Sequence, residues 1–517
     1  MIKRLVLHPI VARVATLGAI LVVAAVVAEA THRHGHTQGD DFALYLRQAR
    51  SLFDGDVGSV IADNRFSVLN SDNSFSPVAY PWGWPILLAP FVHLWGLDYD
   101  RLKVLVVAVY CLFLLVLHGI VRRRLERVLA LGVVGVLATA PPFLTHTDEL
   151  ITEFPHLLAV AVFVWWYDRV RRRGPLHSAG TKDLIVLGVL VTVAFNMRRE
   201  GIVLVAVIAV MQVAELLRVG LLARGDGARG LVTGSVRGLL RVMRESWQRL
   251  LVPHASFVAS AVVFQLLLPS TLLPDNDNSR KYIKDRFGDY PRVLTGQLGL
   301  GQHTIVGVAI IVGALLGVIV GVRRRPSLDG PLALIGLLSA VLISTHFRLI
   351  DRYWLQITPW VVYFAAVASL EGVRIVVRHR LRVARFIALV PLVYLIVVHA
   401  AVLPGVVDTA RDFNAAGKSQ FGPGSPAVEP IFAAVRDETP PTAVVAFYRA
   451  RMMTLTTDRL SIQTTSIDKI LLRADYFAQR RNSHYWQPDL TTTEARDMGL
   501  EMVWSDSRWI LWKVTPP

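Results

Sequence analysis

The stretch GDDFALYLRQAR, residues 39–50, follows soon after the first long apolar run, which extends from about Pro9 to Ala30. It begins with two adjacent carboxylates, Asp40 and Asp41, and continues with apolar residues at helical spacing. One aspartate is enough to cap the helix that this spacing predicts. Capping leaves the second unexplained, and an acidic pair beside an apolar span is costly unless it is paired or does chemistry. We therefore expect Asp40 and Asp41 to be catalytic.

The composition predicts an integral membrane protein. The 517 residues are 53% hydrophobic, with a mean hydropathy of +0.46. A transmembrane helix needs about 20 apolar residues. Runs that reach or approach this length begin near Pro9, Leu102, Val128, Leu150, Leu184, Ile202, Val252, Thr304, Leu332, Tyr353 and Phe386. The expected fold class is therefore a polytopic α-helical membrane protein with about eleven transmembrane helices, the first of them uncleaved.

The positive charge follows the ends of these runs. The formal net charge is +16, but the basic residues cluster as topology signals do, which argues against nucleic-acid binding. Lys3 and Arg4 predict a cytoplasmic N-terminus in a multi-pass protein of the cell (inner or plasma) membrane. The basic segment 218–250 is then a cytoplasmic loop.

The segments 31–101 and 271–303 are expected to be outer loops of a membrane domain that spans residues 1–405. The tail 406–517 has a different composition. It is polar and mixes strand-like pieces with helical ones. We expect it to form a small α/β domain on the extracytoplasmic side, with a hairpin turn at residues 505–508.

Charged residues also gather at three other junctions on the expected outer side. His146, Asp148 and Glu149 precede the fourth run, where they either complement a helix dipole or form a second acidic site. Two further junctions carry arginines against the positive-inside trend. The candidates for a phosphate site at these junctions are Arg198, Arg199, Arg352 and Tyr353. Arg198 and Arg199 could instead be partners for the carboxylates. A local pair of arginine with Glu200 is the alternative for the first junction.

Aromatic residues end the first outer loop. Tyr80, Trp82 and Trp84 lie in a proline-rich segment too short to span. Such residues anchor a segment at headgroup depth, and here we also expect them to form one wall of a lipid-substrate groove.

A metal site is left open by the sequence. His32, His34 and His36 alternate just before the acidic pair and could bind a transition metal, although a solvated tether is the simpler interpretation. No ligand set decides whether a divalent cation takes part.

In combination these features resemble the GT-C membrane glycosyltransferases, in particular the branch of protein mannosyltransferases and lipid A aminoarabinose transferases. Actinobacterial arabinosyltransferases of the same superfamily, which carry an Asp-Asp pair, are also similar. The family commonly has Asp-Glu in loop one, so either aspartate could align. The motifs that carry the resemblance are Asp41-x-x-x-Tyr45, Tyr80-Pro81-x-x-x-Pro85, His146-x-Asp148, Arg198-Arg199-Glu200-Gly201, and Arg352-Tyr353 with Pro359.

The resemblance implies transfer of a sugar from a polyprenyl-phosphate donor to a glycan, lipid or protein acceptor on the outer face, with inversion. Asp41 or Asp40 would be the general base, and Arg352, with Arg198 or Arg199, would stabilise the leaving phosphate. Asp148 and Glu149 would position the acceptor or a cation.

Three other functions remain as alternatives. A transporter predicts charges in mid-span, whereas here they gather at span ends. A glycan polymerase or ligase of another fold would use arginines and a histidine in a late outer loop, for which 271–303 is the candidate. A noncatalytic envelope-assembly protein would not need the acidic pair.

Overall fold

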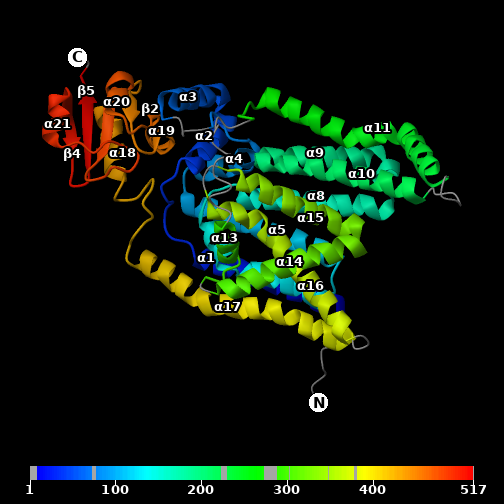
Figure 1. Cartoon of the computed structure of the whole chain (residues 1–517). Coiled ribbons are helices and arrows are strands. Elements are labelled where there is room, and N and C mark those ends of the chain that lie inside the picture. The colour runs from blue at the N-terminus through cyan, green and yellow to red at the C-terminus, as the bar shows by residue number, and fades with distance from the viewer. Residues whose placement is uncertain are drawn as a thin grey trace.

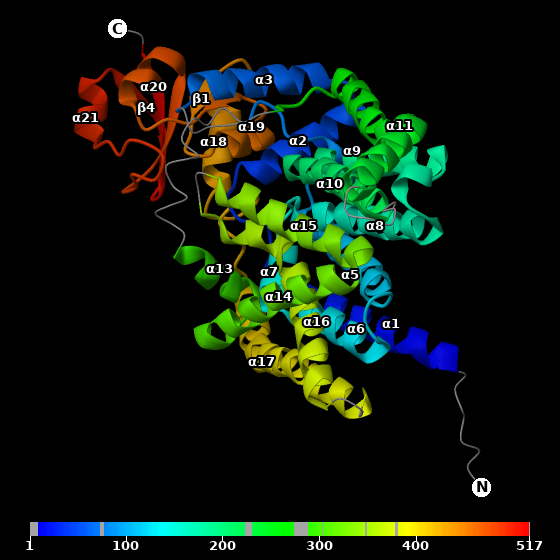
Figure 2. The ribbon, with the colours of Figure 1, turned by 45° about the vertical axis from the view of Figure 1, so that its right-hand side comes forward.

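A computed structural model describes residues 9–72, 77–222, 230–272, 288–301, 303–346, 349–377 and 381–515. Long helices pack side by side into one bundle, and the C-terminal elements form a smaller body next to α2 and α3 (Figure 1). The view turned by 45° shows the same arrangement (Figure 2). Lys3, Arg4 and most of the charged residues of the expected outer loop 271–303 lie outside the described residues.

The helices of the bundle and its loops follow in chain order. They are α1 (Pro9–Ala30), α2 (Asp41–Asp54), α3 (Val57–Asn70), α4 (Gly83–Trp95), α5 (Tyr99–Val121), α6 (Arg127–Thr139), α7 (Pro141–Thr145), η1 (His146–Asp148), α8 (Glu153–Arg173), η2 (Leu176–Ser178), α9 (Thr181–Met197), η3 (Arg199–Ile202), α10 (Val203–Leu222), α11 (Gly230–Leu267), α13 (Asp289–Gln297), α14 (Thr304–Arg324), α15 (Pro326–Ser344), η4 (Asp351–Gln356), α16 (Thr358–Val377) and α17 (Leu381–Ala415).

Every one of the eleven expected apolar runs contains a helix. Within the described residues, six helices are long and apolar enough to cross a membrane, or seven if the pair α6 and α7–η1 is one span bent by 53°. The bend falls at Pro141, whose ring cannot continue a straight helix. The helices in the other expected spans do not meet this test of length and composition. The polytopic helical class therefore holds, and the number eleven stays a prediction.

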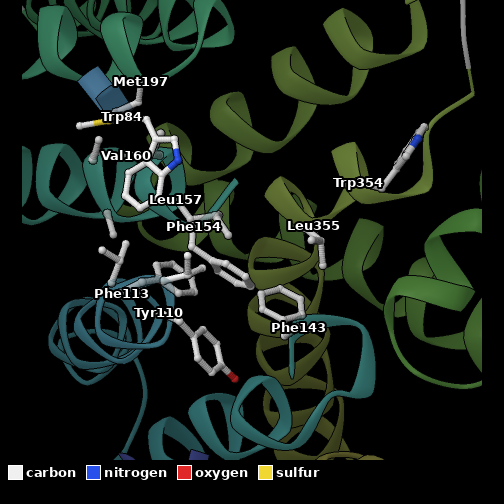
Figure 3. Packing of buried hydrophobic residues seen from close by; sticks show 14 of the residues in the cluster. Trp84, Tyr110, Phe113, Phe143, Phe154, Leu157, Val160, Met197, Trp354 and Leu355 are labelled. Atoms are coloured by element: carbon white, nitrogen blue, oxygen red, sulfur yellow. The ribbon is translucent and has the colours of Figure 1, made fainter. Parts of the chain in front are cut away.

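Aromatic side chains pack in the core where α5, α7 and α8 meet. Tyr110 of α5, Phe143 of α7 and Phe154 of α8 form a cluster with ring centroids 5.1–6.4 Å apart (Figure 3). Such tilted pairs contribute beyond the apolar area that they bury. Because Phe154 directly follows Glu153, this packing fixes where the start of α8 lies.

The C-terminal body is built on a five-stranded sheet. Its elements are α18 (Glu429–Glu438), β1 (Val444–Ala446), α19 (Ala450–Thr457), β2 (Leu460–Ile462), α20 (Ile467–Arg473), β3 (Tyr476–Arg480), α21 (Thr492–Asp497), β4 (Leu500–Ser505) and β5 (Trp509–Val514). The strand order is β2-β1-β3-β5-β4, with β1 parallel to β2 and β3 and the other pairs antiparallel. The expected hairpin is confirmed, since β4 and β5 pair and the Asp506 carboxylate accepts from two backbone N–H groups in the turn.

The expected boundary at 405/406 falls inside a helix. The sequence interpretation ended the last span near Pro404, but α17 contains Pro391 and Pro404 and continues to Ala415. A proline inside a helix removes one hydrogen bond and bends it without necessarily ending it. The sheet domain is therefore joined to the bundle by a helix that extends beyond the apolar run.

A buried ion-pair cluster ties together the ends of three helices far from the acidic loop. Arg124, after α5, forms a bidentate pair with Asp168 of α8 at 2.6 and 2.8 Å, and its Nε lies 3.4 Å from Asp329 of α15. All three side chains have no exposed surface. Tyr363 of α16 donates to Asp329 at 2.7 Å.

We expect Arg124→Ala to destabilise the protein by about 3–5 kcal/mol, because two fully buried carboxylates would lose the buried cation that they share. The partly exposed Arg123 and Arg325 would remain, 3.8 Å from Asp168 and 3.4 Å from Asp329. Thermal unfolding in detergent measures the change. Arg122→Ala is the matched control, since Arg122 is exposed in the same loop and its removal should change stability by no more than about 0.5 kcal/mol. Equal stability of the two variants would contradict this account of the cluster.

Candidate active site

Asp41 is the first residue of α2, and both of its carboxylate oxygens are engaged. Oδ1 accepts a 2.5 Å hydrogen bond from the Tyr80 hydroxyl, and Oδ2 accepts a 2.7 Å bond from Nη2 of Arg352. The side chain is still 37% exposed. Asp41 is therefore a held carboxylate that solvent or a substrate can reach.

Asp40 points to a different partner. Although it lies at the N-cap position of α2, its side chain does not cap that helix. Oδ1 instead accepts from the backbone N–H of Arg451, 3.1 Å away at the start of α19, and Oδ2 lies 3.5 Å from Nη1 of Arg449. Only 9% of the side chain is exposed. Asp40 thus attaches the segment before α2 to the C-terminal domain.

The two aspartates also differ in acidity. Burial raises the pKa of Asp40, and the charges of Arg449 and Arg451 offset this only in part. Partial burial would raise the pKa of Asp41 too, but the charge of Arg352 and the Tyr80 hydrogen bond outweigh it, so the pKa of Asp41 lies below its usual value. Asp41 is the carboxylate held in its ionised form.

Arg352, on η4, joins three acidic segments. Besides Asp41, its guanidinium lies 3.2 Å from Glu153 at the start of α8 and 3.6 Å from Glu149. Glu153 is 1% exposed. The predicted Arg352 and one member of the predicted acidic pair, Asp41, 311 residues apart in sequence, are thus brought together.

Arg198 extends this network. It pairs with Glu153 at 3.0 Å and Glu200 at 2.7 Å, and its guanidinium lies over the ring of Tyr353, 4.7 Å from the centroid. The local pair with Glu200 that the sequence left as the alternative does form. Two guanidinium groups therefore meet the carboxylates of Asp41, Glu149, Glu153 and Glu200. The cluster has a formal excess of two negative charges.

Three other predicted residues lie around this cluster with separate partners. His146 lies 3.6 Å from Glu149. Asp148, although next in sequence to Glu149, is buried against Lys103 at 2.8 Å, so its contacts are those of a structural ion pair. Arg199 donates to the carbonyl oxygen of Thr271 at 3.1 Å and forms no ion pair with a described carboxylate.

The aromatic residues of loop one differ in how far they are buried. Tyr80 is half-buried beside Asp41. Trp82 and Trp84 have no exposed surface, and Trp82 donates to the carbonyl oxygen of Pro269 at 2.9 Å. The expectation that these two tryptophans line a lipid groove is corrected here: the segment folds back into α4 and packs their rings into the interior.

The residues described here contain no group of three or more His, Cys, Asp or Glu side chains that could hold a metal ion. The three loop-one histidines have separate partners, since His32 contacts Thr147, His34 contacts Asp100, and Nε2 of His36 accepts from the backbone N–H of Leu150. Burial lowers the pKa of His32 and His36 to about 4, so both rings are neutral hydrogen-bonding groups at pH 7.

Two residues at or beside the cluster make contacts that the sequence did not predict. Glu153 is one of the acids grouped with Asp148 and Glu149 at the start of the fourth run, but no local signal shows that it meets Arg198 and Arg352. Arg451 lies in an ordinary polar stretch of the tail. Its side chain is 3% exposed and lies against loop one. Only contacts between distant segments reveal either residue.

Comparison with known proteins gives a consistent answer at the level of the fold. No protein-family model matches the sequence, and no curated protein matches it significantly. Among solved structures, ArnT from Cupriavidus metallidurans bound to undecaprenyl phosphate superposes with a TM-score of 0.53 at 12% identity, covering 97% of this chain and 98% of ArnT.

The oligosaccharyltransferase of Archaeoglobus fulgidus is similar as well. Its apo form has a TM-score of 0.53 at 11% identity, covering 96% of this chain and 74% of that one. The archaeal oligosaccharyltransferase AglB from Archaeoglobus fulgidus, in complex with an inhibitory peptide and a dolichol-phosphate, has a TM-score of 0.50 at 11% identity, covering 96% of this chain and 74% of that one. The fold that the sequence motifs predict, that of the GT-C membrane glycosyltransferases, is therefore the fold of this chain.

Proposed function

We propose that this protein is a membrane glycosyltransferase that moves a sugar from a polyprenyl-phosphate donor to an acceptor on the extracytoplasmic face. The observation that carries the proposal is the 2.7 Å contact between the half-exposed Asp41 carboxylate and Arg352. It joins a base to a phosphate-binding group within the GT-C fold. Two proteins of similar fold were solved with undecaprenyl phosphate and a dolichol-phosphate.

The proposed orientation places this cluster outside. Glu153 begins α8 in the acidic cluster, and Arg171, Arg172 and Arg173 end the same helix. The 21 residues of α8 extend about 30 Å at 1.5 Å per residue, which is the thickness of a bilayer core. Arginines at a helix end favour the cytoplasm. The cluster and the C-terminal domain beside it are then extracytoplasmic, and the N-terminus is cytoplasmic.

The proposed reaction is a single displacement. Asp41 takes the proton of an acceptor hydroxyl while that oxygen forms a bond to the anomeric carbon. The bond from this carbon to the phosphate oxygen breaks, and the polyprenyl phosphate leaves with the electron pair. Attack opposite to the leaving group inverts the anomeric centre. Arg352 stabilises the negative charge that develops on the phosphate.

The charge balance implies an exchange of partners at Arg352. A cluster with an excess of two negative charges opposes an incoming phosphate, unless the phosphate replaces a carboxylate. Asp41 is the most exposed of the three carboxylates around Arg352, at 37% against 27% for Glu149 and 1% for Glu153. We propose that the donor phosphate takes its place. Without the charge of Arg352 the pKa of Asp41 rises, which makes Asp41 a stronger base when the donor is bound.

The other residues have supporting roles in this proposal. Arg198 and Tyr353 hold the far side of the phosphate site, and Arg199 lies next to them as a cation without a described carboxylate partner. Glu149, together with His146, is placed to position the acceptor. The ion pair of Asp148 with Lys103 supports this segment from behind.

The proposal is tested in a strain that lacks the gene, complemented with wild-type protein or Asp41→Asn. We expect the Asp41→Asn strain to lose the same envelope glycan as the empty strain, while a polyprenyl-phosphate sugar persists or accumulates. That sugar identifies the donor. Full restoration of the glycan by a stably expressed Asp41→Asn protein would contradict the proposal and favour a transporter or an assembly protein.

A further inference from the structure

We infer that Arg451, carried by the C-terminal domain, is a positioning residue that holds the Tyr80 hydroxyl against Asp41, so that this domain completes the active site. The inference rests on the proposed function and assigns one named residue to the same site. It concerns a residue 410 positions from Asp41 that none of the sequence motifs includes.

The C-terminal domain meets the acidic pair directly. The backbone N–H of Arg451, near the start of α19, donates to Asp40 at 3.1 Å. An acidic side chain at this end of a helix satisfies a free N–H group and complements the helix dipole. Tyr448 also donates to Gln38 at 2.9 Å, just before the acidic pair. These contacts fix α19 against the start of α2.

The side chain of Arg451 is buried in loop one. It is 3% exposed. Nε donates to Asn64 Oδ1 at 3.0 Å, and Nη2 donates to the carbonyl oxygen of Pro77 at 2.6 Å. The guanidinium presents its donors from three nitrogens in a rigid plane, so it fixes two such acceptors in one geometry, whereas the single ammonium of lysine has no such fixed fork. Arg451 thus holds α3 and the segment before Tyr80 in one arrangement.

Tyr80 is the link between Arg451 and the base. Nη1 of Arg451 donates to the Tyr80 oxygen at 3.4 Å, and the guanidinium lies 5.3 Å from the ring centroid. The backbone of Tyr80 is held by Gln48, which donates to its carbonyl oxygen at 3.0 Å and accepts from its N–H at 3.2 Å. With backbone and ring both fixed, the hydroxyl proton is directed to Asp41, 2.5 Å away.

Two other contacts between the same domains do not involve the base. Arg50 of α2 pairs with Asp458, just after α19, at 2.7 Å, with side chains 39% and 65% exposed. Asp72 pairs with Lys469 at 3.4 Å. These partly exposed pairs can attach the domain without Arg451. Arg451 is distinguished by its burial, its contact with Tyr80 and its charge, which adds to the effects of Arg352 and Tyr80 in lowering the pKa of Asp41.

The test compares Arg451→Gln with the matched control Asp458→Asn. Asp458 has a left-handed backbone with φ of 53°, which asparagine tolerates, so this variant removes an interdomain ion pair alone. Transfer is measured from undecaprenyl-phosphate-linked mannose, arabinose or aminoarabinose into membranes of the null strain. We expect Arg451→Gln to lower kcat about 10- to 100-fold with the donor KM changed less than about threefold, because the base is misdirected. Asp458→Asn should stay within about twofold of wild type.

Two further readouts separate a positioning role of Arg451 from a role in holding the two domains together. The acidic limb of the pH profile of kcat/KM should move to higher pH in Arg451→Gln. In a protein that already carries Tyr80→Phe, adding Arg451→Gln should lower kcat much less than it does in the wild type. An unchanged pH profile with fully additive effects, or wild-type kcat in Arg451→Gln, would overturn the inference. If limited proteolysis shows that the domain is detached in Arg451→Gln, Arg451→Lys takes its place and should show an intermediate loss that is coupled to Tyr80 in the same way.

Failure of the proposed function looks different from failure of this inference. If wild-type protein transfers no sugar from any of the three donors and the null strain lacks no glycan, the glycosyltransferase proposal fails. If wild-type protein is active and Arg451→Gln is indistinguishable from Asp458→Asn, only the role of Arg451 fails.

Discussion

Asp41→Asn is expected to lower sugar transfer about 10³-fold while undecaprenyl phosphate binds at least as tightly as to the wild type. An amide of the same shape cannot take the acceptor proton, and loss of a general base costs about 10²- to 10⁴-fold. The amide also no longer competes for Arg352, which is 2.7 Å from the wild-type carboxylate. Transfer assays and binding of radiolabelled undecaprenyl phosphate measure the two effects separately.

Two neighbouring aspartates serve as controls. Asp54→Asn changes a 51%-exposed carboxylate on the same helix. It should leave sugar transfer and undecaprenyl phosphate binding within about twofold of wild type, because surface substitutions usually have small effects. Asp40→Asn weakens the contact with α19 and should cause a smaller loss than Asp41→Asn. The base assignment is wrong if Asp41→Asn retains full transfer, or if Asp40→Asn loses as much while the C-terminal domain remains docked.

Arg352→Gln is expected to lower kcat about 10²- to 10³-fold and also to weaken binding of undecaprenyl phosphate. Among the residues that the structure describes, this guanidinium is the one group with ion pairs to Asp41, Glu149 and Glu153 together. Its loss removes the charge that stabilises the leaving phosphate. Arg352→Lys should recover part of kcat, because it restores the charge without the bidentate geometry. Arg50→Gln, a partly exposed arginine of loop one, should leave transfer unchanged.

The pH profile of kcat/KM gives a second test of Arg352. Its charge is the main cause that lowers the pKa of Asp41 against the effect of burial. Asp41 in the free wild-type enzyme therefore stays ionised, and able to act as a base, to a lower pH than an ordinary aspartate. In Arg352→Gln the pKa rises, so activity should be lost at a higher pH as the solution is acidified. An acidic limb at the same pH in both proteins would show that Arg352 does not act on the base.

Several features of the fold could be predicted from sequence because they depend on local composition. The apolar runs predict helices, since length and hydropathy are properties of each segment alone. The polar tail with its strand and turn signals predicts the small α/β domain, including the pairing of β4 with β5. The expected boundary at 405/406 follows the change in composition, whereas α17 continues to Ala415, because a helix can extend past the end of its apolar run.

The candidate site could be predicted only as a set of residue types. Adjacent aspartates in loop one and arginines at two outer junctions are visible in the sequence, and the structure brings Asp41 and Arg352 together. The two tryptophans of loop one show the limit of this approach. Aromatic residues near a membrane suggest the interface, but Trp82 and Trp84 are packed in the interior.

The sequence by itself determined that this is a polytopic helical chain with a GT-C-like acidic loop and an attached α/β domain. Only the tertiary structure decided that Asp41 faces Arg352 while Asp40 binds α19, that Glu153 joins the two arginines, and that Arg451 reaches Tyr80. Successive residues at the start of a helix point in different directions. Which of them meets a partner hundreds of residues away depends on how distant helices pack, and no local pattern records that.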